Sequence, residues 1–114
     1  MELATEELAG GALLVRLTGR LDMRGADEIS LPLTASLANR ATPVVVDLAG
    51  VSYLASIGIR TLIMNAKAVN KRGGKLVLAG PSPEVLSVLS TAGILEILPT
   101  AETVEAAAAL ASLD

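Results

Sequence analysis

Short apolar runs alternate with glycine-rich or polar turns in the first part of the chain. The mixed segment Glu2–Leu8 and the apolar run Ala12–Leu17 are predicted strands, and Gly10 and Gly11 separate them. Paired glycines adopt the backbone conformations of tight hairpin turns at little steric cost. We therefore expect the two strands to pair antiparallel.

A helix is predicted from about Met23 to Asn39. Asp22 stands at its start, where an aspartate oxygen accepts a hydrogen bond from a first-turn N–H. Pro32 lies inside this segment. Because proline lacks a backbone N–H, it either kinks the helix or lies near a break in it.

The centre of the chain predicts a strand, a helix and a second strand. The β-branched run Pro43–Leu48 and the apolar run Lys75–Ala79 are the strands, and Gly73-Gly74 before the second one is typical of a helix C-cap. This order favours parallel pairing with a right-handed crossover. The residues expected on the buried stripe of the helix are Ile59, Leu62, Ile63, Ala66 and Val69.

The last part of the chain predicts three further elements. A short helix starts at Ser82 or Pro83 and ends by Gly93, and Glu96–Leu98 forms a short fifth strand. An alanine-rich helix begins at Thr100 or Ala101 and ends near Ser112. We expect one α/β domain over residues 1–114, with a mixed, mostly parallel sheet of four to five strands and about four helices.

The amino-acid composition excludes several classes of function. The chain has 52% hydrophobic and 18% charged residues, which favours a packed core over disorder. Tyr53 is its only aromatic residue and its net charge is −3, so neither base stacking nor attraction to phosphate backbones supports direct nucleic-acid binding. Neither histidine nor cysteine occurs, which removes imidazole bases, thiol nucleophiles and the usual zinc ligands.

Other apparent motifs do not point to catalysis. Gly73-Gly74-Lys75 lacks the upstream glycine and following hydroxyl of a phosphate-binding loop. Asp22 and Asp47 fit capping and turn roles better than an acid/base pair. We predict no enzymatic activity, catalytic residue, cofactor or metal site. The acidic N-terminus and the absence of an apolar run near ~18 residues predict a cytoplasmic protein without membrane contact.

Ser56 carries the strongest functional signal, because it lies between a strand and the start of a helix. A serine there is a favoured N-cap, which by itself contributes about 1 kcal/mol to helix stability. Gly58 leaves the approach to this turn uncrowded. The residues alone favour a cap and nothing more, although a cap hydroxyl in such a turn is also accessible to a kinase.

The sequence resembles the STAS domain family, whose bacterial single-domain members are anti-sigma factor antagonists, over nearly its whole length. Leu17–Asp22 is similar to the family's early L-x-G-x-L-D signature, and Val44–Gly58 to its hydrophobic strand and serine-bearing turn. Gly73–Leu78 and Ser90–Ile94 match the later helix end, strand and small-residue turn. The resemblance implies a STAS-like fold for the domain.

The chain departs from the family in the turn itself. The family has aspartate, serine, serine or threonine, and glycine, whereas this chain has Ala55, Ser56, Ile57 and Gly58. Family members are switched by phosphorylation at either hydroxyl position, so the resemblance implies Ser56 as the phosphorylation site. The partner-binding residues that we predict around it are Tyr53, Ala55, Ser56, Ile57, Gly58, Arg60, Met64 and Lys67.

A basic stripe follows on the same predicted helix. Arg60, Lys67 and Lys71 fall within a narrow arc at about 100° per residue, with Met64 beside them. The stripe is either an ordinary solvated helix face or a surface that meets an acidic patch on a partner.

The resemblance implies binding to an anti-sigma factor that is itself a serine kinase, with release of a sigma factor. The kinase inactivates the antagonist and a metal-dependent serine phosphatase restores it, so the ATP and magnesium belong to the kinase. Two alternatives stay open. One is a constitutive adaptor without phosphorylation control, favoured by Ala55 and Ile57, and the other is a small-ligand sensor, which rests on fold analogy alone.

Overall fold

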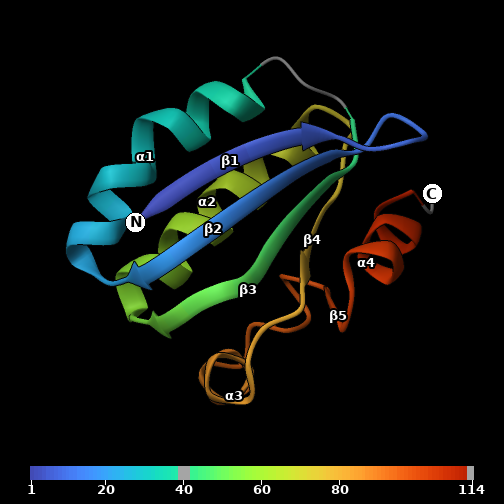
Figure 1. The fold of residues 1–114 in the computed structure, drawn as a ribbon. Coiled ribbons are helices and arrows are strands. Elements are labelled where there is room, and N and C mark those ends of the chain that lie inside the picture. Colours follow the sequence, from blue (N-terminus) through green and yellow to red (C-terminus); the bar gives the residue numbers. More distant parts are fainter. Residues whose placement is uncertain (39–41, 113–114) are drawn as a thin grey trace.

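A five-stranded sheet forms the centre of the computed structural model, which describes residues 1–38 and 42–112. Its order, β1-β2-β3-β4-β5, is also the order of the strands along the chain (Figure 1). β1 is antiparallel to β2 and the other neighbours are parallel, which confirms the predicted mixed, mostly parallel sheet. The strands are β1 (Glu2–Glu7), β2 (Leu13–Leu21), β3 (Val44–Leu54), β4 (Leu76–Ala79) and β5 (Thr100–Ala101).

The predicted hairpin between β1 and β2 is confirmed. Gly10 and Gly11 have φ angles of 89° and 92°, in the left-handed region that glycine adopts without strain. The N–H of Leu8 donates to the carbonyl of Ala12 at 2.8 Å and closes the turn.

β3 is longer than its apolar run predicted. It continues past Leu48 to Leu54 because Val51 and Leu54 are buried in the core. At two register shifts against β2 the pairing skips a residue of β3, as a bulge does, and the strand passes Gly50 without ending. Within β3, only Val44–Asp47 pair with β4, so the carboxyl end of β3 extends beyond β4.

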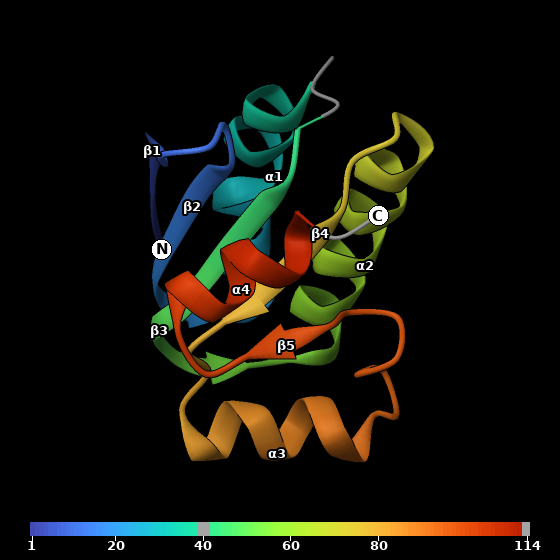
Figure 2. The same cartoon turned by 90° about the vertical axis from the view of Figure 1, so that its right-hand side faces the viewer.

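Helices cover both faces of the sheet. α1 (Met23–Leu37) and α2 (Ser56–Lys71) pack on one face, and α4 (Val104–Ala111) packs on the other (Figure 2). α3 (Pro83–Thr91) lies against the far part of β3. Because both faces are covered, consecutive residues of β2 such as Leu13, Leu14 and Val15 are all buried.

Most of the predicted helix ends are confirmed, and capping interactions lie at them. Asp22 caps α1, and Ser82 caps α3 with Pro83 in its first turn. Gly73 has a φ of 87° and its N–H donates to Asn70, while the N–H of Gly74 donates to Val69, which makes a complete Schellman cap. The glycine pair therefore ends α2, as predicted.

α1 runs through Pro32 as one helix, so no break occurs there. Pro32 is exposed and its ring faces away from the core. The Ser36 hydroxyl donates to the Pro32 carbonyl at 2.7 Å. The predicted end of this helix, Asn39, lies outside the described residues. Within them, α1 ends at Leu37.

Two predictions for the last elements are wrong. Glu96–Leu98 is a turn, in which the N–H of Leu98 donates to the Ile94 carbonyl at 2.8 Å, and the fifth strand is Thr100–Ala101. The last helix starts at Val104 and not at Thr100 or Ala101, because Thr103 caps it and those two residues pair with β4. It ends at Ala111, one residue before the predicted Ser112.

Candidate functional site

The turn between β3 and α2 spans a single residue, Ala55. Ala55 occupies the N-cap position and offers no side-chain cap, and Ser56 is the first residue of the helix. The predicted role of Ser56 as the N-cap is therefore wrong, although its place at the positive end of α2 is as predicted. Within the residues that the structure describes, the exposed Ser56 hydroxyl has no hydrogen-bond partner.

Gly58 lies beneath this turn and is buried. A Cβ there would lie 2.6 Å from Leu21 Cγ and 2.8 Å from the Leu21 carbonyl oxygen, closer than real side chains approach. Glycine is therefore needed for close packing of α2 against β2. Of the predicted partner-binding residues, Gly58 is the one whose burial leaves it no surface to offer.

The end of β2 supports the same turn. The N–H of Ala55 donates to the Leu21 carbonyl at 3.0 Å, which ties the start of α2 to the end of β2. The Gly25 N–H donates to Asp22 at 2.9 Å and lowers the pKa of that carboxyl, with Arg20 lowering it further. Arg20 Nε lies 3.4 Å from Asp22 Oδ2, and its guanidinium lies over the Tyr53 ring at 4.4 Å.

The exposed part of the turn continues along α2. Ser56 and Ile57 are exposed, and Arg60, Met64 and Lys67 follow on the solvent side of the helix. Lys71 is exposed as well. The predicted buried stripe is confirmed for Ile59, Leu62, Ala66 and Val69, while Ile63 is only partly buried.

Sequence reasoning missed Arg20 and Met23 as part of this region. Arg20 ends up beside Tyr53 because the two residues are register partners in β2 and β3. Met23, the first residue of α1, is 76% exposed. Together with Ile57 it lines an open groove between α1 and α2. A methionine at a helix start gives no signal of its own, and only the packing of α1 beside α2 makes it part of the surface.

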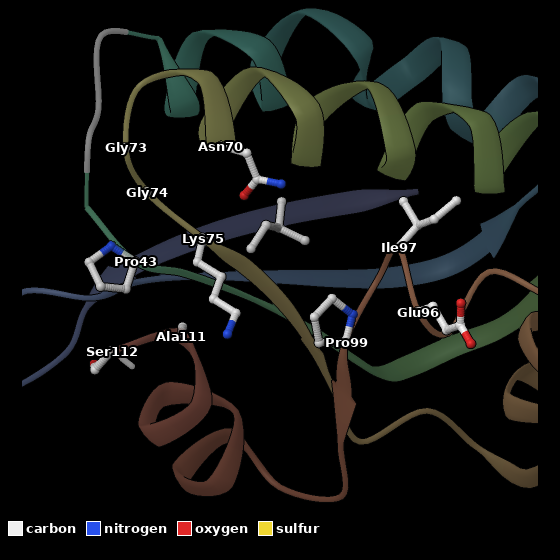
Figure 3. A pocket seen from close by; sticks show the side chains of 11 residues that line it. Pro43, Asn70, Gly73, Gly74, Lys75, Glu96, Ile97, Pro99, Ala111 and Ser112 are labelled. Carbon is white, nitrogen blue, oxygen red and sulfur yellow. The ribbon is translucent and has the colours of Figure 1, made fainter. Parts of the chain in front are cut away.

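A separate pocket of about 600 Å³ lies at the opposite end of the sheet, around Lys75 (Figure 3). The Lys75 side chain points toward the wall formed by Ala111 and Ser112, at the C-terminal end of α4 (Figure 3).

The part of the chain that the structure describes has no group of three or more acidic, histidine or cysteine side chains that could hold a metal ion. Across residues 1–38 and 42–112, no helix combines the length and the apolar character needed to cross a membrane.

A sequence profile of the STAS domain matches residues 4–107. The chain belongs to the STAS domain family. BtrV of Bordetella bronchiseptica, described as a candidate anti-sigma factor antagonist, is 33% identical over 105 residues, which cover 92% of this chain and 90% of BtrV.

Solved structures confirm the STAS fold. An anti-sigma factor antagonist from Mycobacterium paratuberculosis superposes with a TM-score of 0.85 at 21% identity, covering 96% of this chain and 92% of that one. The anti-sigma factor antagonist SpoIIAA in its unphosphorylated form has a TM-score of 0.76 at 19% identity and covers 99% of both chains. Phosphorylated SpoIIAA from Bacillus has a TM-score of 0.67 at 20% identity, covering 93% and 96%.

Proposed function

We propose that this STAS domain is an anti-sigma factor antagonist whose binding is switched by phosphorylation of Ser56. The observation that carries the proposal is the exposed Ser56 hydroxyl, which is not used as a cap, in the first turn of α2. A relative at 33% identity and the solved structures of similar fold bear antagonist names, and one of those structures is phosphorylated. All residues of the switch lie in one domain, which we take to span residues 1–114.

The partner in this proposal is an anti-sigma factor that is also a serine kinase. The unmodified antagonist binds it in the cytoplasm and so frees a sigma factor. The kinase supplies ATP and magnesium for the modification, and a metal-dependent serine phosphatase reverses it. The antagonist itself contributes a surface and an acceptor hydroxyl, without catalysis.

The position of Ser56 explains how phosphate would change binding without unfolding the domain. A phosphoserine carries roughly −1.5 to −2 charge at pH 7, and a helix N-terminus stabilises negative charge. The exposed Ile57 lies next to Ser56, so a partner that covers Ile57 must also strip water from the phosphate. Binding is lost while the fold is kept.

The α2 flank gives the partner a second point of recognition. Arg60, Lys67 and Lys71 are exposed on one side of the helix. These cations attract an acidic patch on the partner and speed its association at low salt. A phosphate on Ser56, one turn before Arg60, competes for the same cations and repels that patch.

The test uses the protein and the anti-sigma factor that it captures from its own host. We expect wild type and Ser56→Ala to bind this kinase equally before ATP and magnesium are added. After addition, wild type is released with phosphate on the peptide 51–60, and Ser56→Ala stays bound. Ser52→Ala is the matched control, because Ser52 is the nearest other serine. This variant should be released like wild type. Release of Ser56→Ala would overturn Ser56 as the acceptor.

The second candidate function is a constitutive adaptor. Ala55 and Ile57 favour it, because they replace a carboxylate and a hydroxyl of the family's turn. An adaptor would stay associated with a signalling complex that contains no anti-sigma factor. Its turn would be unmodified in both the bound and the unbound pools.

A further inference from the structure

α1 and α2 leave an open groove between their N-terminal halves, with a volume of about 830 Å³. It lies between the two helices that cover one face of the sheet, and Ile57, the residue after Ser56, is one of its lining residues. Its floor and walls include Met23, Ala26, Asp27, Ser30, Ile57 and Thr61. The groove is distinct from the cationic flank of α2, because Arg60 and Lys67 do not line it.

Two large apolar side chains line this groove. Met23 on α1 is 76% exposed and Ile57 on α2 is 38% exposed. Methionine is flexible and polarisable, which suits it to contact a partner's apolar side chains. Leu31, two turns further along α1, is 82% exposed and does not line the groove, so it offers a matched control on the same helix.

The charged side chains around the groove indicate which charge a docking partner should carry. Arg24 lies 4.0 Å from Glu28, which also holds the N-terminal ammonium at 2.6 Å. Asp22 is engaged by Arg20 and by the Gly25 N–H. The exposed Asp27 carboxylate has no ion-pair partner among residues 1–38 and 42–112. The groove therefore presents the Asp27 carboxylate beside Met23 and Ile57, while Asp22 and Arg24, the other charged residues that line it, each lie near an opposite charge.

We propose that this groove receives an amphipathic helix of the anti-sigma factor. A groove between two helices accommodates a third helix, whose apolar residues at i, i+3 and i+4 pack between Met23 and Ile57. A lysine or arginine on that helix faces Asp27. This inference rests on the proposed function and adds to it the chemistry of the docking segment and the half of the surface contributed by α1.

The groove also couples docking to the switch. Ser56 does not line the groove, but it directly precedes Ile57, so a phosphate on Ser56 brings its shell of bound water next to this contact. A helix seated against Ile57 would have to remove that water without replacing its hydrogen bonds. Phosphorylation therefore weakens the apolar contact in the groove as well as the contact at the cationic flank.

The test measures the dissociation constant of the unphosphorylated protein with the captured anti-sigma factor. We expect Met23→Ser to weaken binding about tenfold or more, as loss of an interface anchor does, and Leu31→Ser to bind like wild type. Asp27→Asn should weaken binding and make it less sensitive to salt. All three residues are exposed, and circular dichroism melts verify that the variants fold.

Wild-type affinity in Met23→Ser and Asp27→Asn would overturn the groove while leaving the proposed function in place. Equal weakening in Leu31→Ser would also overturn it, because the effect would then not be specific to the groove. Failure of wild type to bind any anti-sigma factor would instead reject the proposed function, and the groove's occupant with it.

Discussion

Gly58 lies where the first turn of α2 comes closest to β2. A methyl group at this position would meet the Leu21 side chain at 2.6 Å and the Leu54 side chain at 3.0 Å. We expect Gly58→Ala to lower the free energy of unfolding by about 1–3 kcal/mol, because the added carbon forces apart elements that are already in contact. Urea denaturation measures this difference.

Ser56→Ala is the matched control for that experiment, since the two residues share one turn. Because Ser56 is the first helical residue and not the cap, we expect its removal to change stability by no more than about 0.5 kcal/mol. A loss of about 1 kcal/mol would mean that its hydroxyl caps α2 in solution.

Asp22 makes stability depend on pH. The Gly25 N–H and Arg20 lower the pKa of the Asp22 carboxyl in the folded protein, so folding favours its charged form. This stabilisation is complete above the ordinary aspartate pKa and is lost as pH falls through the lowered one. We expect wild type to lose more stability between pH 5 and pH 2 than Asp22→Asn, which keeps an N-cap without a charge. Urea denaturation at several pH values measures the free energy of unfolding of both proteins. An equal loss of stability in the two would contradict this expectation.

At the scale of elements, α3 depends on its cap. The Val85 N–H donates to the Ser82 hydroxyl at 3.3 Å. We expect Ser82→Ala to destabilise the protein by about 1 kcal/mol, measured by thermal or urea unfolding. Ser87→Ala, an exposed position inside the same helix, should be neutral or slightly stabilising, because alanine is the better helix former. Equal effects at both positions would show that the cap contributes nothing.

Caps and apolar periodicity made most elements predictable from the sequence. Asp22, Ser82 and Gly73 mark helix ends through local chemistry that needs no tertiary contact. The errors occur where tertiary pairing decides. Glu96–Leu98 is as apolar as a strand, yet only Thr100–Ala101 lies alongside β4.

The candidate site was predictable in part. The position of Ser56 at the start of α2 followed from the apolar stripe that begins at Ile59, but the sequence does not distinguish a cap from a first helical residue one position later. The place of Met23 beside Ile57 depends on the packing of α1 beside α2. The spacing of residues along the chain does not predict how closely two helices pack.

At the scale of the whole molecule, α4 closes the second face of the sheet with small side chains. Ala107 is fully buried, in one cluster with Leu14, Val45 and Val77. We expect Ala107→Leu to lower stability by about 1–3 kcal/mol, because the larger side chain pushes α4 away from the sheet. Ala109→Leu, at an exposed position on the same helix, is the control and should leave the unfolding midpoint nearly unchanged. Equal midpoints for the two variants would mean that α4 does not pack tightly.

The strand order of the sheet has a consequence for synthesis on the ribosome. The strands lie side by side in the order in which they are translated, so each one emerges next to an edge that is already formed. The β1-β2 hairpin is made first, and no later strand has to insert between two earlier ones. A nascent chain with this topology can fold progressively from its N-terminus, which shortens the time that its apolar strands are exposed to aggregation.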